Sequence, residues 1–265
     1  MLVAGAQLEA SADYEESLAR GREAIATAAH RGASLVVLPE LYMAWTPTTV
    51  DPAICAALAQ PLDGPFVRGL AEAARDNGVW VVSGMIERPC GDSERAYNTI
   101  VVLDARGNLA ASYRKTHLYD AFGYEESRAL LPGNRLFEPM ESPLGCTGLL
   151  VCYELRFPEV ARHQVERGAE VLLVPSAWIA GPMKEHHWRS LVVARAIENT
   201  AYVVAIDQVG NQFIGQSLVV DPMGVVLAEG PEVEGIVYAE IDPGRVSAVR
   251  EKVPSLRHRR PELFT

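Results

Sequence analysis

The feature that most constrains the fold of this chain is a series of short, uninterrupted apolar runs separated by helical patterns. Ser34–Leu38 and Val79–Met85 are such runs, and each has the length of a strand. Runs without polar alternation are typical of strands buried on both faces of a parallel sheet. Between them, Phe66–Asn77 has apolar residues at helical spacing and is followed by Gly78, a residue type that commonly ends helices. This part of the chain therefore predicts parallel strands linked by helices.

The rest of the chain repeats this alternation and adds two hairpins. Further strands are predicted at Leu2–Gln7, Gly148–Val151, Val171–Pro175 and Tyr202–Ile206, and further helices at Tyr14–His30, Pro158–Arg167 and Trp188–Thr200. Turn signals at 105–108 and 221–224 predict the hairpins Asn98–Asp104 with Leu109–Arg114 and Ser217–Val220 with Val225–Ala228. Ala121–Pro132 has no clear period and is interpreted as a loop or a broken helix. The sum predicts an α/β fold, a four-layer α-β-β-α sandwich of two mixed sheets.

Composition limits the class of protein further. A chain of 265 residues, 49% of them apolar and without a linker, predicts one domain spanning residues 1–265. The net charge of −10 argues against nucleic acid or an anionic membrane as a partner. No apolar run reaches the roughly 18 residues of a membrane span, and no signal peptide is recognisable, so a cytoplasmic location is expected. The four cysteines show no metal-binding spacing, and His186 and His187 cannot share one helix face; no metal and no cofactor is predicted.

Three residues with catalytic chemistry each follow a predicted strand. Glu40 comes after Ser34–Leu38, Lys115 ends Leu109–Arg114, and Cys152 closes Gly148–Val151. Ligands and catalytic groups gather at the carboxyl ends of strands in α/β sheets. Taken singly, each residue has an ordinary alternative: a solvated loop glutamate, a surface lysine, a small buried cysteine. Spacing alone does not bring them together.

Cys152 has the more specific surroundings. A strand ends at this residue and a helix is predicted from Pro158, so a sharp corner would lift the thiol out of the sheet, as in the nucleophile elbow of other hydrolases. The backbone N–H of Tyr153 could then bind an oxyanion. A nearby lysine would favour the thiolate and neutralise a developing oxyanion.

The sequence resembles the carbon–nitrogen hydrolase (nitrilase) superfamily over nearly its whole length. The motifs that carry the resemblance are Leu38-Pro39-Glu40, Tyr113–Leu118, Cys152–Glu159 and Ala194–Asn199. The resemblance implies Cys152 as nucleophile, Glu40 as general base and acid, and Lys115 as oxyanion stabiliser. It also implies a second glutamate after the lysine, for which Glu126 fits best and its neighbour Glu125 remains open.

The substrate is less constrained. Arg156 follows the nucleophile by four residues, and a guanidinium suits a carboxylate, although an ion pair with Glu159 is equally compatible with the sequence. Aromatic residues that follow strands or the lysine motif could line a small pocket or simply pack in the core; they are Tyr42, Tyr119, Phe122 and Trp178. In the sequences of its motifs, the chain resembles the ω-amidase and deaminated-glutathione amidase branch. This resemblance implies that the substrate is a small molecule that bears a carboxylate and a terminal amide. Hydrolysis of that amide would release ammonia.

Other functions remain open at this point. On the same fold, N-carbamoyl amino acid hydrolase, nitrilase, acyltransferase or another amidase activity is possible. Outside this chemistry, the chain could be a catalytically silent interaction module or a thiol redox sensor. The segment 253–265 is basic in an acidic protein and too short for a core of its own. We expect it to dock on a partner subunit, which implies a homodimer or higher homo-oligomer.

Overall fold

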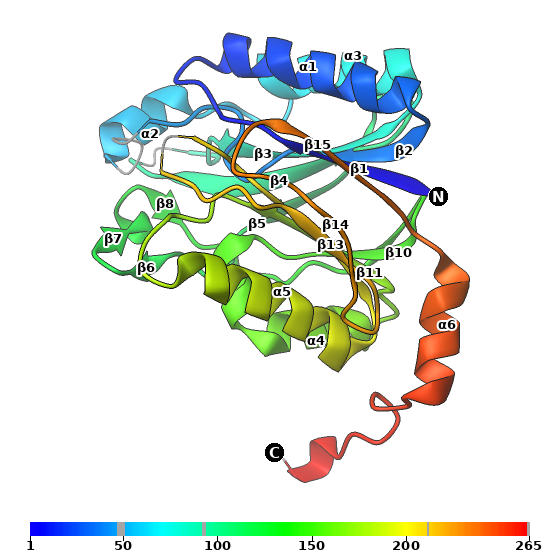
Figure 1. Ribbon diagram of the computed structural model, residues 1–265. Helices are drawn as coiled ribbons and strands as arrows, with labels where there is room; N and C mark the ends of the chain where they lie inside the picture. Colours follow the sequence, from blue (N-terminus) through cyan, green and yellow to red (C-terminus); the bar gives the residue numbers. More distant parts are fainter. Residues whose placement is uncertain (47–50, 92–93, 211, 264–265) are drawn as a thin grey trace.

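The computed structural model describes residues 1–46, 51–91, 94–210 and 212–263. Within these residues the chain forms two mixed sheets that lie between two layers of helices, as Figure 1 shows. The predicted four-layer sandwich is confirmed. Among the described residues no helix combines the length and the apolar character needed to cross a bilayer.

The first sheet has the strand order β15-β1-β2-β3-β4-β5, with β8 paired to β4. Its strands are β1 (Leu2–Gln7), β2 (Ala33–Val37), β3 (Trp80–Glu87), β4 (Ala96–Leu103), β5 (Leu109–Arg114), β8 (Leu130–Leu131) and β15 (Gly235–Glu240). β1, β2 and β3 are parallel, and the order becomes antiparallel from β3 onward. The predicted hairpin at 105–108 joins β4 and β5, but the change to antiparallel order already occurs between β3 and β4, one strand earlier than the sequence indicates.

The second sheet has the strand order β14-β13-β12-β11-β10-β9. Its strands are β9 (Met140–Ser142), β10 (Gly145–Leu149), β11 (Val171–Ser176), β12 (Tyr202–Asp207), β13 (Leu218–Val220) and β14 (Val226–Glu229). β10, β11 and β12 are parallel, and the predicted second hairpin forms β13 and β14.

The outer faces of the two sheets are covered by α1 and α3 on one side and by α4 and α5 on the other (Figure 1). The α-helices of the described residues are α1 (Tyr14–His30), α2 (Pro52–Leu58), α3 (Pro65–Asn77), α4 (Pro158–Val165), α5 (Lys184–Asn199) and α6 (Pro243–Lys252). α1 and α3 lie over the first sheet and bury Ile25 and Leu70 against it, while α4 and α5 lie over the second. Gly5 marks the close approach of the sheets, since a Cβ there would stand 2.0 Å from the side chain of Ile206 on β12.

Several elements depart from the sequence prediction. β15, α2 and α6 were not predicted, and α5 begins at Lys184, four residues before the expected Trp188. The segment expected to be a loop or broken helix contains the small hairpin β6 (Asp120–Ala121) with β7 (Tyr124–Glu125), then the 3-10 turn η1 (Glu126–Arg128) and β8. This hairpin turns through Phe122 and Gly123, both at positive φ (56° and 81°). Such a turn matches the twist of two short strands.

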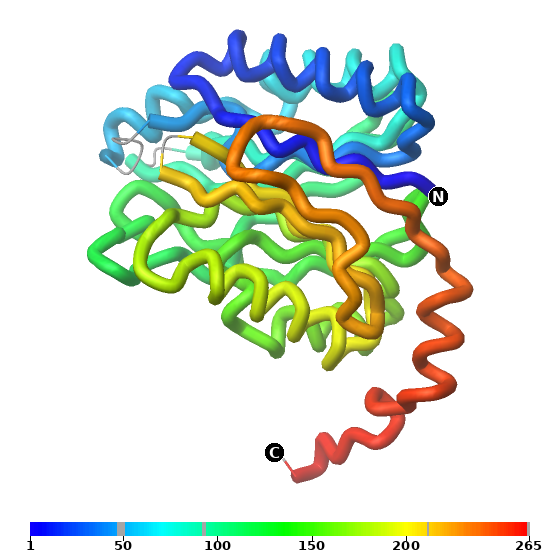
Figure 2. Tube along the Cα trace, in the orientation of Figure 1, coloured from blue at the N-terminus to red at the C-terminus, as the bar shows by residue number. Residues whose placement is uncertain are grey.

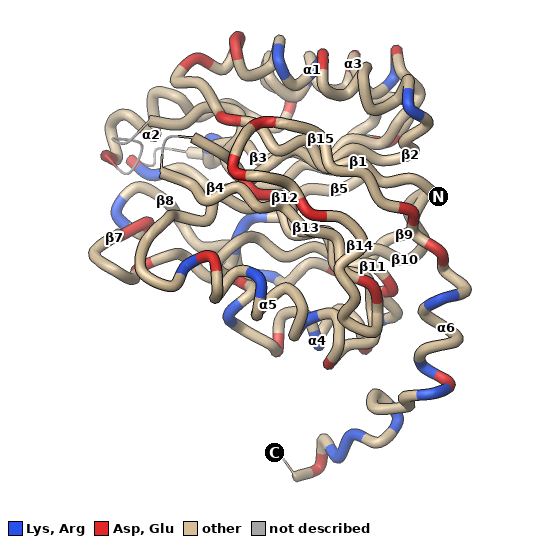
Figure 3. Tube along the Cα trace, viewed as in Figure 1, with Lys and Arg blue, Asp and Glu red and all other residues tan. Residues whose placement is uncertain are grey.

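The C-terminal part of the chain lies beside the sandwich. In the tube of Figure 2, α6 and the segment after it run along one end of the layers and then away from them. Arg250 donates to the carbonyl of Ala169, and Arg259 forms an ion pair with Glu166 at the end of α4. Lysine and arginine recur along this part of the chain, as the blue segments in Figure 3 show. It ends in η3 (Pro261–Leu263).

Candidate active site

A cavity opens where strands of both sheets end. Eight of the residues singled out in the sequence line it: Glu40, Lys115, Tyr119, Glu126, Cys152, Tyr153, Arg156 and Trp178. They come from segments after β2, β5, β10 and β11, so the convergence of strand ends gathers them. Lys184, Tyr124, Ile179, Trp45 and Phe213 complete much of the wall.

Two aromatic residues expected in the wall lie elsewhere. Tyr42 is fully buried, and its hydroxyl donates to the carbonyl of Ser17 in α1 at 2.8 Å. The reason is local: Leu41 takes a positive φ of 52°, and it is Leu41 rather than Tyr42 that lines the cavity. The prediction of Tyr42 as a substrate-binding residue is therefore wrong. Phe122 is 68% exposed and lies in a surface groove beside the cavity.

Glu40 is held by donors on both carboxylate oxygens. Its Oε1 accepts from Lys115 Nζ at 2.9 Å and from Asn98 Nδ2 at 2.7 Å, and its Oε2 accepts from the Ala177 amide at 2.8 Å. The backbone of Glu40 lies directly against Gly84 of β3, where a Cβ would stand 2.3 Å from the nitrogen of Leu41. Only glycine at position 84 leaves room for the loop that carries Glu40.

Lys115 lies between two carboxylates. Its Nζ donates to Glu40 at 2.9 Å and to Glu126 at 2.8 Å, and its side chain is 2% exposed. Burial alone would lower the pKa of this lysine, but the two carboxylates outweigh it and raise the pKa well above its ordinary value. The ammonium is therefore firmly charged and faces the cavity beside the thiol.

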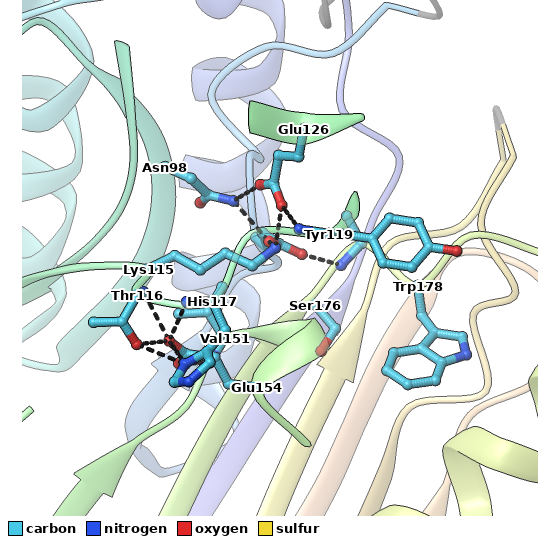
Figure 4. Close-up of polar contacts among 12 residues, drawn as sticks. Asn98, Lys115, Thr116, His117, Tyr119, Glu126, Val151, Glu154, Ser176 and Trp178 are labelled. Carbon is cyan, nitrogen blue, oxygen red and sulfur yellow. Dashed lines mark hydrogen bonds and ion pairs between the residues drawn. The ribbon is translucent and has the colours of Figure 1, made fainter. Parts of the chain in front are cut away.

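The structure places Glu126, not Glu125, beside the lysine. Glu126 is buried, and its Oε2 also accepts from the Tyr119 amide at 2.6 Å, whereas Glu125 is exposed. The β6–β7 hairpin makes this possible by returning the chain to the end of β5. Asn98 on β4 bridges the two glutamates, donating to Glu126 Oε1 at 3.0 Å as well as to Glu40 (Figure 4). Sequence reasoning missed Asn98; a lone amide within an apolar strand was its only signal.

Cys152 stands on a strained corner. It follows β10, begins the 3-10 turn η2 (Cys152–Arg156) and has a φ of 45°, which is uncommon for a residue with a side chain. The predicted strand–turn–helix elbow is present. Burial and the neighbouring Glu40 raise the pKa of the thiol well above its ordinary value, although Lys115 opposes this. The resting sulfur is a thiol, and it needs a base to become a nucleophile.

Glu154 ties this corner to the lysine segment. Its Oε2 accepts from the Val151 amide at 2.9 Å, and its Oε1 accepts from the Tyr113 hydroxyl at 2.8 Å and from the Thr116 amide and hydroxyl at 2.8 and 2.6 Å. Figure 4 shows Glu154 lying with Thr116, His117 and Val151. Burial would raise the pKa of this fully buried carboxyl, but its hydrogen bonds with His117, Thr116 and Val151 outweigh burial and lower it. An ionised Glu154 thus holds the residues beside Lys115 and Cys152 together.

The opposite wall carries two further cations. The Arg156 guanidinium lies 5.0 Å from the centre of the Trp178 ring, and its Nη2 is 3.4 Å from His187 Nδ1. Its Nε is buried without a hydrogen-bond partner, and it makes no ion pair with any described residue, Glu159 included. Lys184, which sequence reasoning did not single out, is 3% exposed and donates to the Tyr119 hydroxyl at 3.0 Å. Among the described residues no group of three or more His, Cys, Asp or Glu side chains is placed to hold a metal ion.

The fold and this site define a class: a four-layer hydrolase sandwich with glutamate, lysine and cysteine at the converging strand ends. The sequence profile described as carbon-nitrogen hydrolase matches residues 2–251. The chain belongs to the carbon–nitrogen hydrolase family, and its activity is the hydrolysis of amide bonds, carbon–nitrogen bonds other than those of peptides.

Relatives and solved structures are similar to this chain over all or nearly all of its length. Deaminated glutathione amidase of Escherichia coli O157:H7 is 40% identical, with all of both chains covered, and the human protein of that name is 37% identical over 99% of this chain and 83% of its own. The NitFhit protein of C. elegans has a TM-score of 0.92 at 32% identity, over 100% of this chain and 66% of that one. An amidase mutant of Nesterenkonia sp. AN1 has a TM-score of 0.83 at 30% identity, over 100% and 95%. In that structure the acetamide moiety of fluoroacetamide is covalently attached to the active-site cysteine.

Proposed function

We propose that this protein hydrolyses the amide of a small, carboxylate-bearing substrate through a thioester on Cys152. The observation that carries the substrate class is Arg156, a half-buried guanidinium in the cavity wall that has no carboxylate partner among the described residues. A guanidinium kept in such a place matches a planar carboxylate in geometry and in charge. The curated relatives are named for the amide of deaminated glutathione, which supports an amide over a nitrile.

In this mechanism Glu40 takes the thiol proton as the sulfur attacks the carbonyl carbon. The oxyanion of the tetrahedral intermediate is stabilised by the Lys115 ammonium and the Tyr153 N–H. Glu40 returns the proton to the amide nitrogen, the C–N bond breaks, and ammonia leaves. Glu40 then deprotonates a water molecule that attacks the thioester, the C–S bond breaks, and the acid product and the thiol are released.

The remaining polar residues of the site position this machinery. Glu126 accepts from Lys115 and from the Tyr119 amide, and Asn98 donates to both Glu126 and Glu40. These two residues therefore hold Lys115 and Glu40 at fixed separations. Because burial and Glu40 raise the pKa of the thiol, acylation requires the transfer of its proton to Glu40. No step calls for a metal or an organic cofactor.

The experiment that tests this function combines mass spectrometry with ammonia release. Succinamate is offered to the enzyme beside butyramide, N-carbamoyl-β-alanine and the nitrile of the same acid, and the intact protein is weighed after rapid quenching. We expect a succinyl adduct on Cys152 and ammonia from succinamate, and neither with Cys152→Ala. Turnover of the carbamoyl compound or the nitrile in preference to succinamate would refute the amide, and an adduct on another residue would refute the nucleophile.

We further propose that the protein is a cytoplasmic homodimer in which segment 253–265 docks on the partner subunit. Free thiols at all four cysteines suit a reducing compartment, and the basic tail suits an acidic surface. Light scattering after size-exclusion chromatography tests the assembly on the full chain and on a variant ending at Lys252. A monomeric full chain would refute the dimer, and an unchanged dimer after truncation would refute the role of the tail.

A further inference from the structure

Lys184 is a buried cation for which the catalytic mechanism has no use. The chain has three lysines: Lys115 in the catalytic set, the exposed Lys252 on α6, and Lys184 at the start of α5. Lys184 is 3% exposed and lines the same cavity as Cys152. Ion pairs among the described residues do not include it. Burying an ammonium without a carboxylate costs free energy, so an unpaired one in a cavity calls for a ligand.

The surroundings of Lys184 hold it in place without neutralising it. Its Nζ donates to the Tyr119 hydroxyl at 3.0 Å and lies 4.8 to 4.9 Å from the centres of the rings of Tyr119, Phe122 and Trp178. Its own carbonyl accepts from Trp178 Nε1 at 3.0 Å. The aromatic rings favour a cation through their faces, but they supply no negative charge.

A second cation shares one of these rings. Arg156 lies 5.0 Å from the centre of the Trp178 ring and Lys184 Nζ lies 4.9 Å from it. Burial lowers the pKa of Lys184, and the positive charge of Arg156 adds to this lowering, so an anion bound by both residues would oppose it. Behind this wall the buried Asp207 accepts from the Trp178 amide at 2.7 Å and forms no ion pair with either cation. The cavity carboxylates Glu40 and Glu126 pair with Lys115, and no ion pair among the described residues joins an acid to Arg156 or Lys184. The balancing anion is therefore expected from a ligand.

We propose that Lys184 and Arg156 together hold the carboxylate on the acyl part of the substrate, with Lys184 a specificity residue of this enzyme. The inference rests on the proposed function and extends it. We assign the bound carboxylate to the acyl part of the substrate because Arg156 belongs to the same 3-10 turn as Cys152, to which the acyl group becomes attached. The groove past Lys184, lined by Phe122, Pro182 and Gln212, is left for whatever the amide nitrogen carries.

The test uses matched amides that differ by one charge. Succinamate and butyramide share a length, with a methyl group in place of the carboxylate on the acyl side. N-butyrylglycine and N-ethylbutyramide differ in the same way on the nitrogen side. Each is assayed with the wild type, Lys184→Met, Arg156→Gln and the double variant. Lys252→Met is the matched control, because it removes an exposed lysine far from the cavity.

A bound carboxylate makes a charge-assisted hydrogen bond to each cation, so we expect Lys184→Met to lower kcat/KM for succinamate about ten- to hundredfold, mainly through KM. Butyramide should change by less than about threefold, and Lys252→Met should leave all four substrates unchanged. In the double variant the loss should be smaller than the product of the two single losses, because both residues contact one group.

Three outcomes separate the possible failures. If the wild type does not prefer succinamate over butyramide, the carboxylate-bearing substrate itself is wrong. If the preference is present and lost in Arg156→Gln but intact in Lys184→Met, the proposed function stands and the role of Lys184 is refuted. If Lys184→Met impairs N-butyrylglycine and spares succinamate, Lys184 serves the nitrogen side and the assignment to the acyl side is overturned.

Discussion

Replacing Glu154 with glutamine tests whether one buried charge holds the catalytic corner together. The wild-type carboxylate accepts hydrogen bonds from Val151, Tyr113 and Thr116 at 2.6 to 2.9 Å, and glutamine can offer only one oxygen to these donors. Hydrogen bonds to a charged group contribute about 1.5–3 kcal/mol each against roughly 1 for neutral ones. Allowing for relaxation, Glu154→Gln should cost about 3 kcal/mol of unfolding free energy. In a chain of this size that corresponds to a Tm lower by roughly 6–12 °C.

The activity of Glu154→Gln should fall for a different reason than its stability. Loss of the bonds to Val151 and Thr116 releases the backbone on both sides of the site, so Cys152 and Lys115 lose their fixed separation. Misplacement by about 1 Å can cost about a hundredfold in rate. We expect kcat to fall by that order while KM changes little. Circular dichroism melts and steady-state ammonia release measure the two effects, with Glu159→Gln as an exposed control on the same segment.

The pH dependence provides the decisive check on this reasoning. The pKa of Glu154 is lowered in the folded protein from an ordinary value of 4.5, so its stabilising effect is fully present above that value and is lost as the pH falls through the folded pKa. The difference in unfolding free energy between the wild type and Glu154→Gln should therefore be constant from pH 7 to about 5.5 and shrink below about 4.5. A variant with unchanged Tm at pH 7, or a difference that grows on acidification, would refute an ionised Glu154.

The other predictions concern the catalytic set. Cys152→Ala should abolish ammonia release while its Tm stays within a few degrees of the wild type; substantial turnover by the purified variant would remove Cys152 as nucleophile. Glu40→Gln should fail in both acylation and deacylation, and a rapid acyl burst seen by quenched-flow mass spectrometry would show that another base activates the thiol. Lys115→Ala should lower kcat by about 10²–10³, the usual cost of one oxyanion donor; a rate close to that of the wild type would place Lys115 outside the oxyanion site.

Local periodicity accounts for the parts of the fold that the sequence predicts well. Leu2–Gln7 and Tyr14–His30 have the same bounds in the structure as in the prediction, because an apolar run and a 3.6-residue repeat are written within the segments themselves. β15 was missed because the pairing that stabilises it is with β1, at the other end of the chain. α6 was also missed, although Asp242 at its N-cap and Pro243 at its first position are residue types that favour the start of a helix.

The site residues, too, were predicted where the signal is local in sequence and missed where it depends on tertiary contacts. Glu40, Lys115 and Cys152 were found because they follow strands and stand in family motifs. Asn98 lies within a strand, and its importance appears only when the β6–β7 hairpin brings Glu126 across to meet it. The Tyr42 side chain points away from the cavity because Leu41 has a positive φ. A leucine gives no sequence signal for that backbone conformation. The proposed role of Lys184 depends on Arg156, which is distant in sequence, and on Trp178, which is near in sequence but forms no recognisable motif with it.

The contact between Gly84 and the loop of Glu40 has a consequence for how mutations in this protein would be read. A methyl group at position 84 would collide with backbone, at 2.3 Å from the Leu41 nitrogen and 2.6 Å from the Glu40 carbonyl carbon, so no side-chain rotation relieves it. Every replacement therefore displaces the general base. In a deep mutational scan for hydrolysis, position 84 would tolerate as little variation as Cys152 itself, although it lies outside the substrate cavity. Intolerance in such a scan marks the supports of a mechanism as well as its reacting groups.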